Sequence, residues 1–298
     1  MTSARFGRVL TAMVTPFDAT GALNLVAAAE LARYLVAHGS DALVVAGSTG
    51  EGTALSDEEK LELLEAVVAA VSVPVLAGTT GSDTRRSVEL TARASQLGIA
   101  GILATTPAYA RPSQAGIAAH LGAVAAATPL PVMLYDIPSR TGRKIAATTT
   151  IELVGSHANV VALKDASADL PSAAHVKAVL GSRLDLYSGD DALTLPFMAI
   201  GAEGIVSVAA HWAGEQFAAM VAAAAAGRWD EARRLNEVLA PSCAFESSEA
   251  HPNPVPAKAA MRALGLDVGQ CRLPLGEADA QIDGRARALV GELGAPRG

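Results

Sequence analysis

The chain has 298 residues, of which 51% are apolar, and it carries a formal net charge of −7 with a sequence pI of about 5.4. This charge argues against nucleic acid or an anionic membrane as a partner, because both require clustered lysine and arginine. Cys243 and Cys271 have no metal-site spacing, so we expect a reduced, cytoplasmic protein without disulfides. The apolar run 9–14 is too short for a membrane span or a signal-peptide core.

Eight short apolar runs, rich in β-branched residues, predict strands. In chain order they cover residues 9–15, 42–47, 73–77, 101–105, 131–135, 160–164, 184–188 and 204–208. Helical patterns lie between them, as at 56–71, 83–97 and 113–127. In the first of these, Ser56 can cap the helix and Glu59 can complete a capping box. Four further helical patterns follow the last strand, at 215–226, 229–245, 255–264 and 278–293.

The regular alternation of strand and helix predicts a parallel sheet covered by helices. Eight such units in about 225 residues fit an α/β fold of the (β/α)8 TIM-barrel type, whose usual size is about 250 residues. The alternative is a doubly wound open sheet, which usually has a glycine-rich fingerprint after its first strand, and residues 15–21 have none. We therefore expect a catalytic barrel over residues 1–226 and a C-terminal helical extension over 227–298.

Barrel enzymes carry their chemistry at the carboxyl ends of the strands. Polar residues gather at these ends in five places. They are Gly47-Ser-Thr-Gly-Glu51, Thr105-Thr-Pro-Ala-Tyr109, Tyr135-Asp-Ile-Pro-Ser-Arg140, Lys164-Asp165 and Ser188-Gly-Asp-Asp191. Several of these residues have a structural interpretation as well as a functional one; Glu51, for example, can hold its own loop through backbone amides.

Lys164 ends the apolar run of the sixth predicted strand. It can be a strand-end lysine whose ammonium reaches water. A strand of a barrel is covered on both faces, however, so the side chain points either into the barrel mouth or into the layer of helices. An amine withdrawn from water there can serve as a nucleophile. Its position alone leaves both interpretations open.

The other strand-end residues also allow two interpretations. Ser48 and Thr49 can satisfy backbone amides at the strand exit, or they can approach a ligand carboxylate together with the adjacent amides. Tyr109 and Tyr135 can be packing residues, or with a serine they can relay protons. Arg140 can be an exposed loop charge or a bidentate clamp for a substrate carboxylate.

The sequence does not predict a metal or phosphate site. The six histidines lie singly, without ligand spacing. Asp190 and Asp191 could bind Mg²⁺, but they fit better as caps of a helix that begins at Ala192. The sequence has no dinucleotide or phosphate-binding fingerprint. We expect neither a metal nor a cofactor.

Four of the strand-end motifs, 47–51, 135–142, 163–166 and 188–191, together resemble the dihydrodipicolinate synthase family. These are pyruvate-dependent class I aldolases, in a superfamily that includes N-acetylneuraminate lyase. The similarity runs from residues 11–17 to the tail motifs 252–258 and 272–274, which is nearly the whole chain. The resemblance implies a lyase with a TIM barrel, assembled as a homotetramer that is a dimer of dimers.

The resemblance also implies a role for each matching residue. Lys164 would form the Schiff base with pyruvate, and Tyr135 would transfer protons beside it. Tyr109 would be offered across a dimer interface by the neighbouring subunit, and Ser48 would be the third member of the proton relay. Thr49 would bind the pyruvate carboxylate, and Arg140 would bind the carboxylate of aspartate semialdehyde. Gly189 and Val206 would line the pocket with their backbone.

Two residues bear on the second substrate. Ser48 stands where the synthases usually have threonine and matches the lyase branch; it keeps the hydroxyl but lacks the methyl that restricts its rotamer. Arg140 favours the synthase, because a carboxylate substrate requires that cation. The expected reaction is condensation of pyruvate with L-aspartate 4-semialdehyde to 4-hydroxy-tetrahydrodipicolinate, in lysine and diaminopimelate biosynthesis. The alternatives are an aldolase or dehydratase for a sugar acid, and a non-catalytic binding barrel.

The resemblance bears on regulation as well. Lysine-inhibited members of the family use a histidine, a glutamate, an asparagine and a tyrosine near the dimer interface. The matching positions are Lys60, Arg86, Ser82 and Ala108. A cationic effector would meet two cations there, so we expect weak or absent inhibition by lysine.

Overall fold

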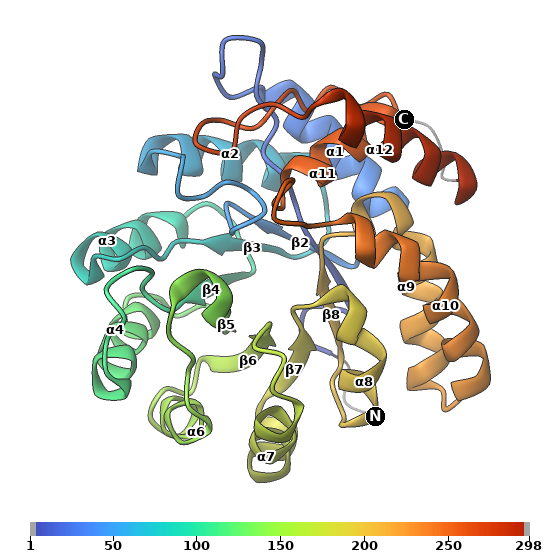
Figure 1. The fold of residues 1–298 in the computed structure, drawn as a ribbon. Helices are drawn as coiled ribbons and strands as arrows, with labels where there is room; N and C mark the ends of the chain where they lie inside the picture. The colour runs from blue at the N-terminus through green and yellow to red at the C-terminus, as the bar shows by residue number, and fades with distance from the viewer. Residues whose placement is uncertain (1–3, 295–298) are drawn as a thin grey trace.

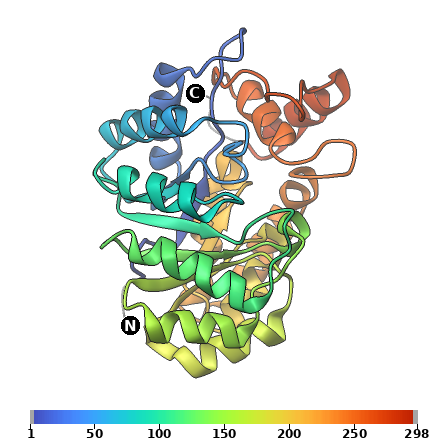
Figure 2. The same cartoon turned by 90° about the vertical axis from the view of Figure 1, so that its left-hand side faces the viewer.

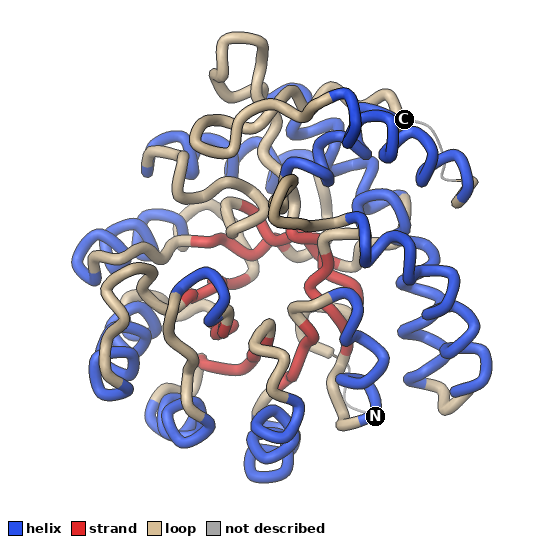
Figure 3. The backbone as a smooth tube through the Cα atoms, in the orientation of Figure 1, coloured by secondary structure: helices blue, strands red, loops and turns tan. Residues whose placement is uncertain are grey.

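A computed structural model of the chain describes residues 4–294. Its parallel strands close into a barrel, β1 to β8 in chain order, with β8 paired to β1. Figures 1 and 3 look along this barrel, with the strands in a central ring and the helices around it. The predicted (β/α)8 barrel is confirmed and the open-sheet alternative is wrong. Within the predicted segments 1–226 and 227–298, residues 1–3 and 295–298 lie outside the described part of the chain.

The strands are short and almost completely buried. They are β1 (Val9–Ala12), β2 (Ala42–Val45), β3 (Val75–Gly78), β4 (Gly101–Thr105), β5 (Val132–Asp136), β6 (Val160–Asp165), β7 (Asp185–Ser188) and β8 (Gly204–Ser207). None extends more than one residue beyond its predicted run. Six of the eight strands end within one residue of their predicted ends, while β1 ends three residues earlier and β2 two residues earlier than predicted.

Helices follow each strand, and further ones close the chain. They are α1 (Leu25–Ala37), α2 (Asp57–Ala70), α3 (Thr84–Ala94), α4 (Gln114–Ala126), α5 (Pro138–Thr141), α6 (Ala147–Ser156), α7 (Leu170–Leu180), α8 (Thr194–Ala199), α9 (Ala210–Ala225), α10 (Trp229–Phe245), α11 (Val255–Ala263) and α12 (Ala280–Glu292), with 3₁₀ turns η1 (Gly181–Arg183) and η2 (Asp191–Leu193). The capping box predicted at Ser56 is confirmed, because the Glu59 N–H donates to Ser56 Oγ at 3.1 Å and the Ser56 N–H donates to Glu59 Oε2 at 2.8 Å. Among the described residues, no helix is long and apolar enough to cross a membrane.

The alternation of side chains along the strands divides the apolar core in two. One cluster fills the inside of the barrel and includes Leu10, Val44, Leu103, Met133 and Val206. The larger cluster lies between the strands and the surrounding helices. A side chain at a strand end therefore faces either the inside of the barrel or the helices, according to its place in this alternation.

The C-terminal helices pack on one side of the barrel. Helix α10 packs against α9, and α11 packs against α12 and α9. In Figures 1 and 2 the orange and red C-terminal segments lie beside the blue N-terminal ones. Hydrogen bonds join them, since the Phe17 N–H donates to Val268 O at 3.3 Å and Asn24 Nδ2 donates to Asp267 Oδ2 at 3.3 Å. The extension thus reaches the loops that leave the first strands.

Candidate active site

Lys164 and Tyr135 lie side by side on neighbouring strands. The register of β5 and β6 pairs the two residues, and the Lys164 Nζ lies 4.2 Å from the centre of the Tyr135 ring. Both side chains are 4% exposed. Tyr135 belongs to the interior cluster, as does Ala162, which is two residues before Lys164 and so on the same strand face. Lys164 therefore points into the barrel, where an amine withdrawn from water can act as a nucleophile.

Gly189 and Val206 border the same space. A Cβ on Gly189 would lie 3.0 Å from Lys164 Cγ and 2.9 Å from the Ala166 Cβ, so only glycine fits this close to the lysine. The Gly189 N–H donates to Asp165 O at 2.7 Å, which fixes the turn after β7 against the end of β6. Val206 is 1% exposed and shares the interior cluster with Tyr135. The fold thus places Gly189 directly against Lys164 and Val206 in the interior of the same barrel.

The loop after β2 is tightly folded around Ser48 and Thr49. Glu51, which ends the motif, has a left-handed φ of 53°, and a Cβ on Gly52 would lie 2.1 Å from Ala46 O. Thr49 is 4% exposed and Ser48 is half-buried. Within residues 4–294 neither hydroxyl accepts from a backbone amide, so the structural interpretation of the pair as local caps is wrong. The strain of this loop points to a functional reason for its shape.

Asn253 connects Thr49 with Arg140. Its side-chain amide donates to Thr49 Oγ1 at 3.0 Å, and its backbone carbonyl accepts from Arg140 Nη2 at 3.0 Å. Because an amide NH₂ only donates, the Thr49 hydroxyl accepts here and keeps its own hydrogen for another acceptor. The Asn253 Oδ1 is buried and has no hydrogen-bond partner among the described residues. The role of Asn253 was not predicted, and its only signal in the sequence is its place in the tail motif 252–258.

Glu51 holds its loop by binding the C-terminal extension, in part through a backbone amide as predicted. Its Oε1 pairs with Lys258 Nζ at 2.7 Å, with both side chains 1% exposed. Its Oε2 accepts from the Arg272 N–H at 2.8 Å. These two contacts fix Glu51, and with it the loop that carries Thr49 two residues earlier. The partners themselves were not predicted, because both come from the far end of the chain.

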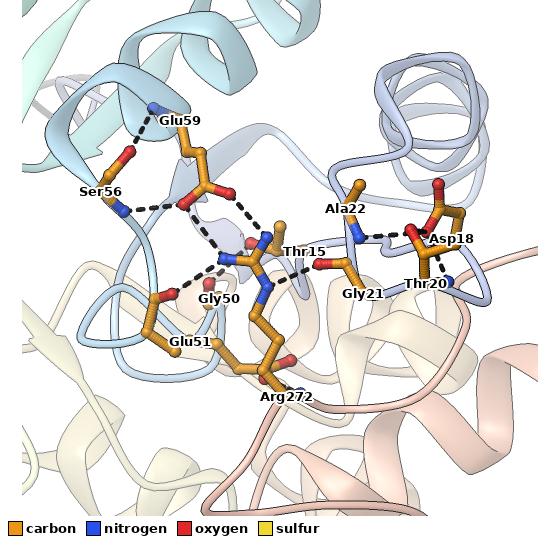
Figure 4. Close-up of polar contacts among 11 residues, drawn as sticks. Thr15, Asp18, Thr20, Gly21, Ala22, Gly50, Glu51, Ser56, Glu59 and Arg272 are labelled. Atoms are coloured by element: carbon orange, nitrogen blue, oxygen red, sulfur yellow. Dashed lines mark hydrogen bonds and ion pairs between the residues drawn. The ribbon is translucent and has the colours of Figure 1, made fainter.

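The Arg272 guanidinium binds the loops after β1 and β2 and the first turn of α2. It donates to Glu59 Oε1 at 2.6 Å, to Gly21 O at 2.8 Å and to Ala54 O at 2.9 Å. Figure 4 shows the guanidinium between Glu59 and Gly21, with Glu51 close to its backbone. Phe17 lies beneath, with Arg272 Cζ 4.3 Å and Lys258 Nζ 4.2 Å from the centre of its ring. The extension therefore holds the loops after β1 and β2 in one position.

Tyr109 lies apart from this site in the single chain. Its side chain is 97% exposed, and its φ of 69° places a bulky residue in the left-handed region. Arg140 is also exposed, at the end of the short helix α5, but its hydrogen bond to Asn253 turns it toward Thr49. The structure thus places Lys164 and Tyr135 side by side with Gly189 against them and Val206 in the same interior cluster. It joins Thr49 to Arg140 through Asn253, and it leaves Tyr109 on the surface.

Two buried carboxyl groups lie directly behind the Tyr135 and Lys164 pair. Asp136 and Asp165 are paired in the register of β5 and β6, on the face turned away from the inside of the barrel. Burial raises the pKa of Asp136 to about 7, and the charge of Asp165 adds to this effect. Burial also raises the pKa of Asp165, although hydrogen bonds from Ser167 oppose the shift. This acidic pair is a source of pH dependence next to the site.

A second acidic group consists of Asp190 and Asp191, after β7, and Glu246, directly after α10. Asp190 Oδ1 accepts from the Ala192 N–H at 3.0 Å, so the predicted cap at this position is confirmed. Asp191 was predicted to share that role, and this is wrong: its Oδ2 accepts from the Val208 and Ala209 N–H groups at 2.9 and 3.1 Å, which caps α9. Helix α9 is kinked at Ala213, whose backbone is not helical, so the part after the kink begins close to the predicted start at 215. Burial, with the charge of Asp191, raises the pKa of Glu246 well above its usual range.

Within residues 4–294 there is no group of three or more histidine, cysteine, aspartate and glutamate side chains that could hold a metal ion. Three site residues have buried polar side chains, Lys164, Tyr135 and Thr49, and they offer an amine and two hydroxyls. These groups suit covalent capture of a carbonyl and proton transfer.

Known proteins of one family match the chain over nearly its whole length. The model of the dihydrodipicolinate synthetase family matches residues 5–292. The 4-hydroxy-tetrahydrodipicolinate synthases of Moorella thermoacetica and Acidothermus cellulolyticus are 47% and 49% identical to it, over 97% and 98% of this chain and 99% and 94% of theirs. A dihydrodipicolinate synthase from Cyanidioschyzon merolae, solved with lysine bound, is 41% identical with a TM-score of 0.94, covering 98% of this chain and 99% of that one. With this agreement of sequence, fold and strand-end residues, the chain belongs to the dihydrodipicolinate synthetase family.

Proposed function

We propose that this protein condenses pyruvate with L-aspartate 4-semialdehyde to give 4-hydroxy-tetrahydrodipicolinate, through a Schiff base on Lys164. The observation that carries the proposal is the amine of Lys164, which lies 4.2 Å from the Tyr135 ring inside the barrel and is shielded from water. The relatives named as 4-hydroxy-tetrahydrodipicolinate synthases, at 42–49% identity, favour this reaction over that of a sugar-acid aldolase. A non-catalytic barrel would not need an amine in this position.

The chemistry begins with attack of the Lys164 amine on the C2 carbonyl of pyruvate. Loss of water leaves an iminium, which acts as an electron sink and makes the pyruvate methyl acidic. Removal of one methyl proton gives an enamine, and its carbon attacks the aldehyde of the second substrate. The amino group of the semialdehyde then adds to the imine carbon and displaces Lys164, which closes the ring and frees the enzyme.

Thr49 and Arg140 are proposed to hold the two carboxylates. Because Asn253 occupies the acceptor side of the Thr49 hydroxyl, that hydroxyl can donate to the pyruvate carboxylate. Arg140 donates one N–H to the Asn253 carbonyl, and the remaining donors of its guanidinium can bind the carboxylate of aspartate semialdehyde. Gly189 and Val206 would line the pocket between them.

Ser48, Tyr135 and Tyr109 are proposed as a proton relay that spans two subunits. The exposure of Tyr109 supports this arrangement, because the residue has almost no contacts within its own chain. We infer a homotetramer, built as a dimer of dimers, in which the neighbouring subunit supplies Tyr109. A cytoplasmic location fits a biosynthetic enzyme with two free cysteines among its described residues.

A steady-state assay of the purified enzyme tests the substrate assignment. Pyruvate with aspartate semialdehyde should be turned over at least a hundredfold faster than N-acetylneuraminate or a 2-keto-3-deoxy sugar acid. Faster cleavage of either sugar acid would overturn the choice of second substrate and leave the Schiff base intact.

A further inference from the structure

The C-terminal extension has a further attachment to the barrel at Glu246. This residue directly follows α10, and α10 packs against η2, the turn after β7. The Glu246 carboxyl forms a hydrogen bond with the carboxyl of Asp191, the first residue of η2. Glu246 Oε2 is buried, and no N–H or O–H among the described residues donates to it. The proposed reaction leaves this acid without a role.

The hydrogen bond between the two carboxyl groups requires a proton on one of them, because carboxylates only accept. Asp191 accepts from Ser207 Oγ and from the N–H groups of Val208 and Ala209. These donors stabilise the charged form of Asp191 at the start of α9. Glu246 Oε2 has no such donor, and burial, followed by the charge of Asp191, raises the pKa of Glu246 well above its usual range. The proton therefore lies on Glu246.

The groups around Glu246 allow only its neutral form in this position. The charge of Asp190 also raises the pKa of Glu246, although less than burial and Asp191 do. The charge of Lys164 acts in the opposite direction and more weakly. Burial raises the pKa of the Cys243 thiol on the last turn of α10, so that group adds no charge. An ionised Glu246 would be repelled by the Asp191 carboxylate and would leave this attachment.

The linking segment, residues 246–253, runs from this attachment to Asn253. At its two ends, the Asn253 N–H donates to Ser247 Oγ at 3.3 Å. In its middle, the Ser248 N–H donates to His251 O at 2.9 Å and the His251 N–H donates to Ser248 Oγ at 3.0 Å. These hydrogen bonds fold the segment back on itself. A displacement at its first residue is therefore passed to its last.

We propose that Glu246 is a positioning residue for the binding of both substrate carboxylates. As a neutral acid it donates to Asp191, and through the linking segment it keeps Asn253 in place. Asn253 in turn holds Thr49 and Arg140. This inference rests on the proposed function, because it takes Thr49 and Arg140 as the groups that bind substrate.

Borohydride trapping of the pyruvate adduct in the full-length enzyme, over a series of pyruvate concentrations, tests the positioning role. Glu246→Met should raise the half-saturating pyruvate concentration about threefold to tenfold and leave the maximal extent of adduct unchanged. Glu246→Gln can donate to Asp191 from its amide and should stay within about twofold of the wild type. Glu249→Met, the control, changes an exposed acid of the same segment and should have no measurable effect.

A double-mutant cycle tests whether Glu246 acts through Asn253. In the Asn253→Ala background, Glu246→Met should change the half-saturating pyruvate concentration by less than about twofold, because the contact that Glu246 positions is already absent. Effects of the two changes that multiply as if independent would overturn the proposal.

Infrared difference spectroscopy between the wild type and Glu246→Gln at neutral pH tests the protonation state. The wild type should show the C=O stretch of a protonated carboxyl group that Glu246→Gln lacks, and absence of this band would overturn the proposal. The measurement uses only the conservative variant, so it also decides the case in which Glu246→Met does not fold. Cooperative urea unfolding of Glu246→Met checks that its weaker pyruvate binding is not lost structure.

Failure of this inference can be told apart from failure of the proposed function. A wild type that forms no pyruvate adduct would refute the proposed function itself. If the wild type forms the adduct, an unchanged half-saturating concentration in Glu246→Met, or an equal loss in Glu246→Gln, would overturn only the role of Glu246.

Discussion

The side-chain amide of Asn253 donates to Thr49 Oγ1 at 3.0 Å, across a separation of 204 residues in sequence. The contact joins the C-terminal extension to the loop after β2 and sets the direction in which the Thr49 hydroxyl can donate. The same asparagine holds Arg140 through its backbone carbonyl. One residue of the extension thus orients the proposed binding groups for both substrate carboxylates.

Replacement of Asn253 by alanine should therefore raise the KM for pyruvate about tenfold, equivalent to about 1.4 kcal/mol, because the Thr49 hydroxyl loses its fixed orientation. Steady-state kinetics with each substrate varied in turn measures the effect. Asn159→Ala is the matched control, since Asn159 Nδ2 donates to the carbonyls of Ala125, Thr128 and Leu130, away from the site. An unchanged KM for pyruvate in Asn253→Ala would contradict the claim that Asn253 positions Thr49.

Arg140→Ala should raise the KM for aspartate semialdehyde by one to two orders of magnitude, equivalent to about 1.5–3 kcal/mol for a charge-assisted contact. Formation of the pyruvate adduct should be unaffected, because that step precedes the second substrate. Arg143→Ala is the control, since Arg143 donates to the carbonyl of Arg111 on the surface. Unchanged turnover in Arg140→Ala would contradict both the clamp and most of the substrate assignment.

The ion pair of Lys258 with Glu51 should dominate the attachment of the extension. Lys258→Met leaves a carboxylate buried without its partner and should lower the free energy of unfolding by about 3–5 kcal/mol. The double variant Glu51→Gln with Lys258→Met should recover part of this loss. Urea denaturation of the wild type, Lys258→Met and the double variant measures these free energies of unfolding. Arg93→Gln breaks the exposed ion pair with Glu58 and should lower the free energy of unfolding by less than about 1 kcal/mol. Equal losses in Lys258→Met and Arg93→Gln would contradict the dominant role of the buried pair.

The raised pKa of Asp136, about 7, predicts a pH dependence of stability with a definite sign. The folded state binds the proton more tightly than the unfolded state, so the contribution of Asp136 is largest at acid pH and is lost as pH rises toward about 7. Asp136→Asn keeps an acceptor for the Ile145 N–H and removes the titration. The free energy of unfolding of the wild type, minus that of Asp136→Asn, should therefore decrease between about pH 4 and pH 8. A difference that is constant or increases would contradict the cause given for the shift.

The barrel could be predicted from the sequence because it depends on local periodicity. Strand ends made Lys164 and Tyr135 candidates, but only the family resemblance implied that the two lie side by side. Asn253, Lys258 and Arg272 could not, since their partners lie far away along the chain and periodicity carries no information about such pairs. Asp191 was assigned to the wrong helix for the same reason, because its carboxylate reaches the helix after the next strand. The role proposed for Tyr109 requires a second chain, which no pattern within this one can place.

Borohydride reduction of the enzyme with pyruvate, followed by mass spectrometry of its peptides, tests the Schiff base most directly. Lysine is scarce in this chain, at positions 60, 144, 164, 177 and 258, so the site of reaction can be assigned without ambiguity. A reduced pyruvate adduct should form on the peptide that contains Lys164, and none should form in Lys164→Arg. An adduct on another lysine, or undiminished turnover by Lys164→Arg, would contradict the assignment of Lys164 as the nucleophile.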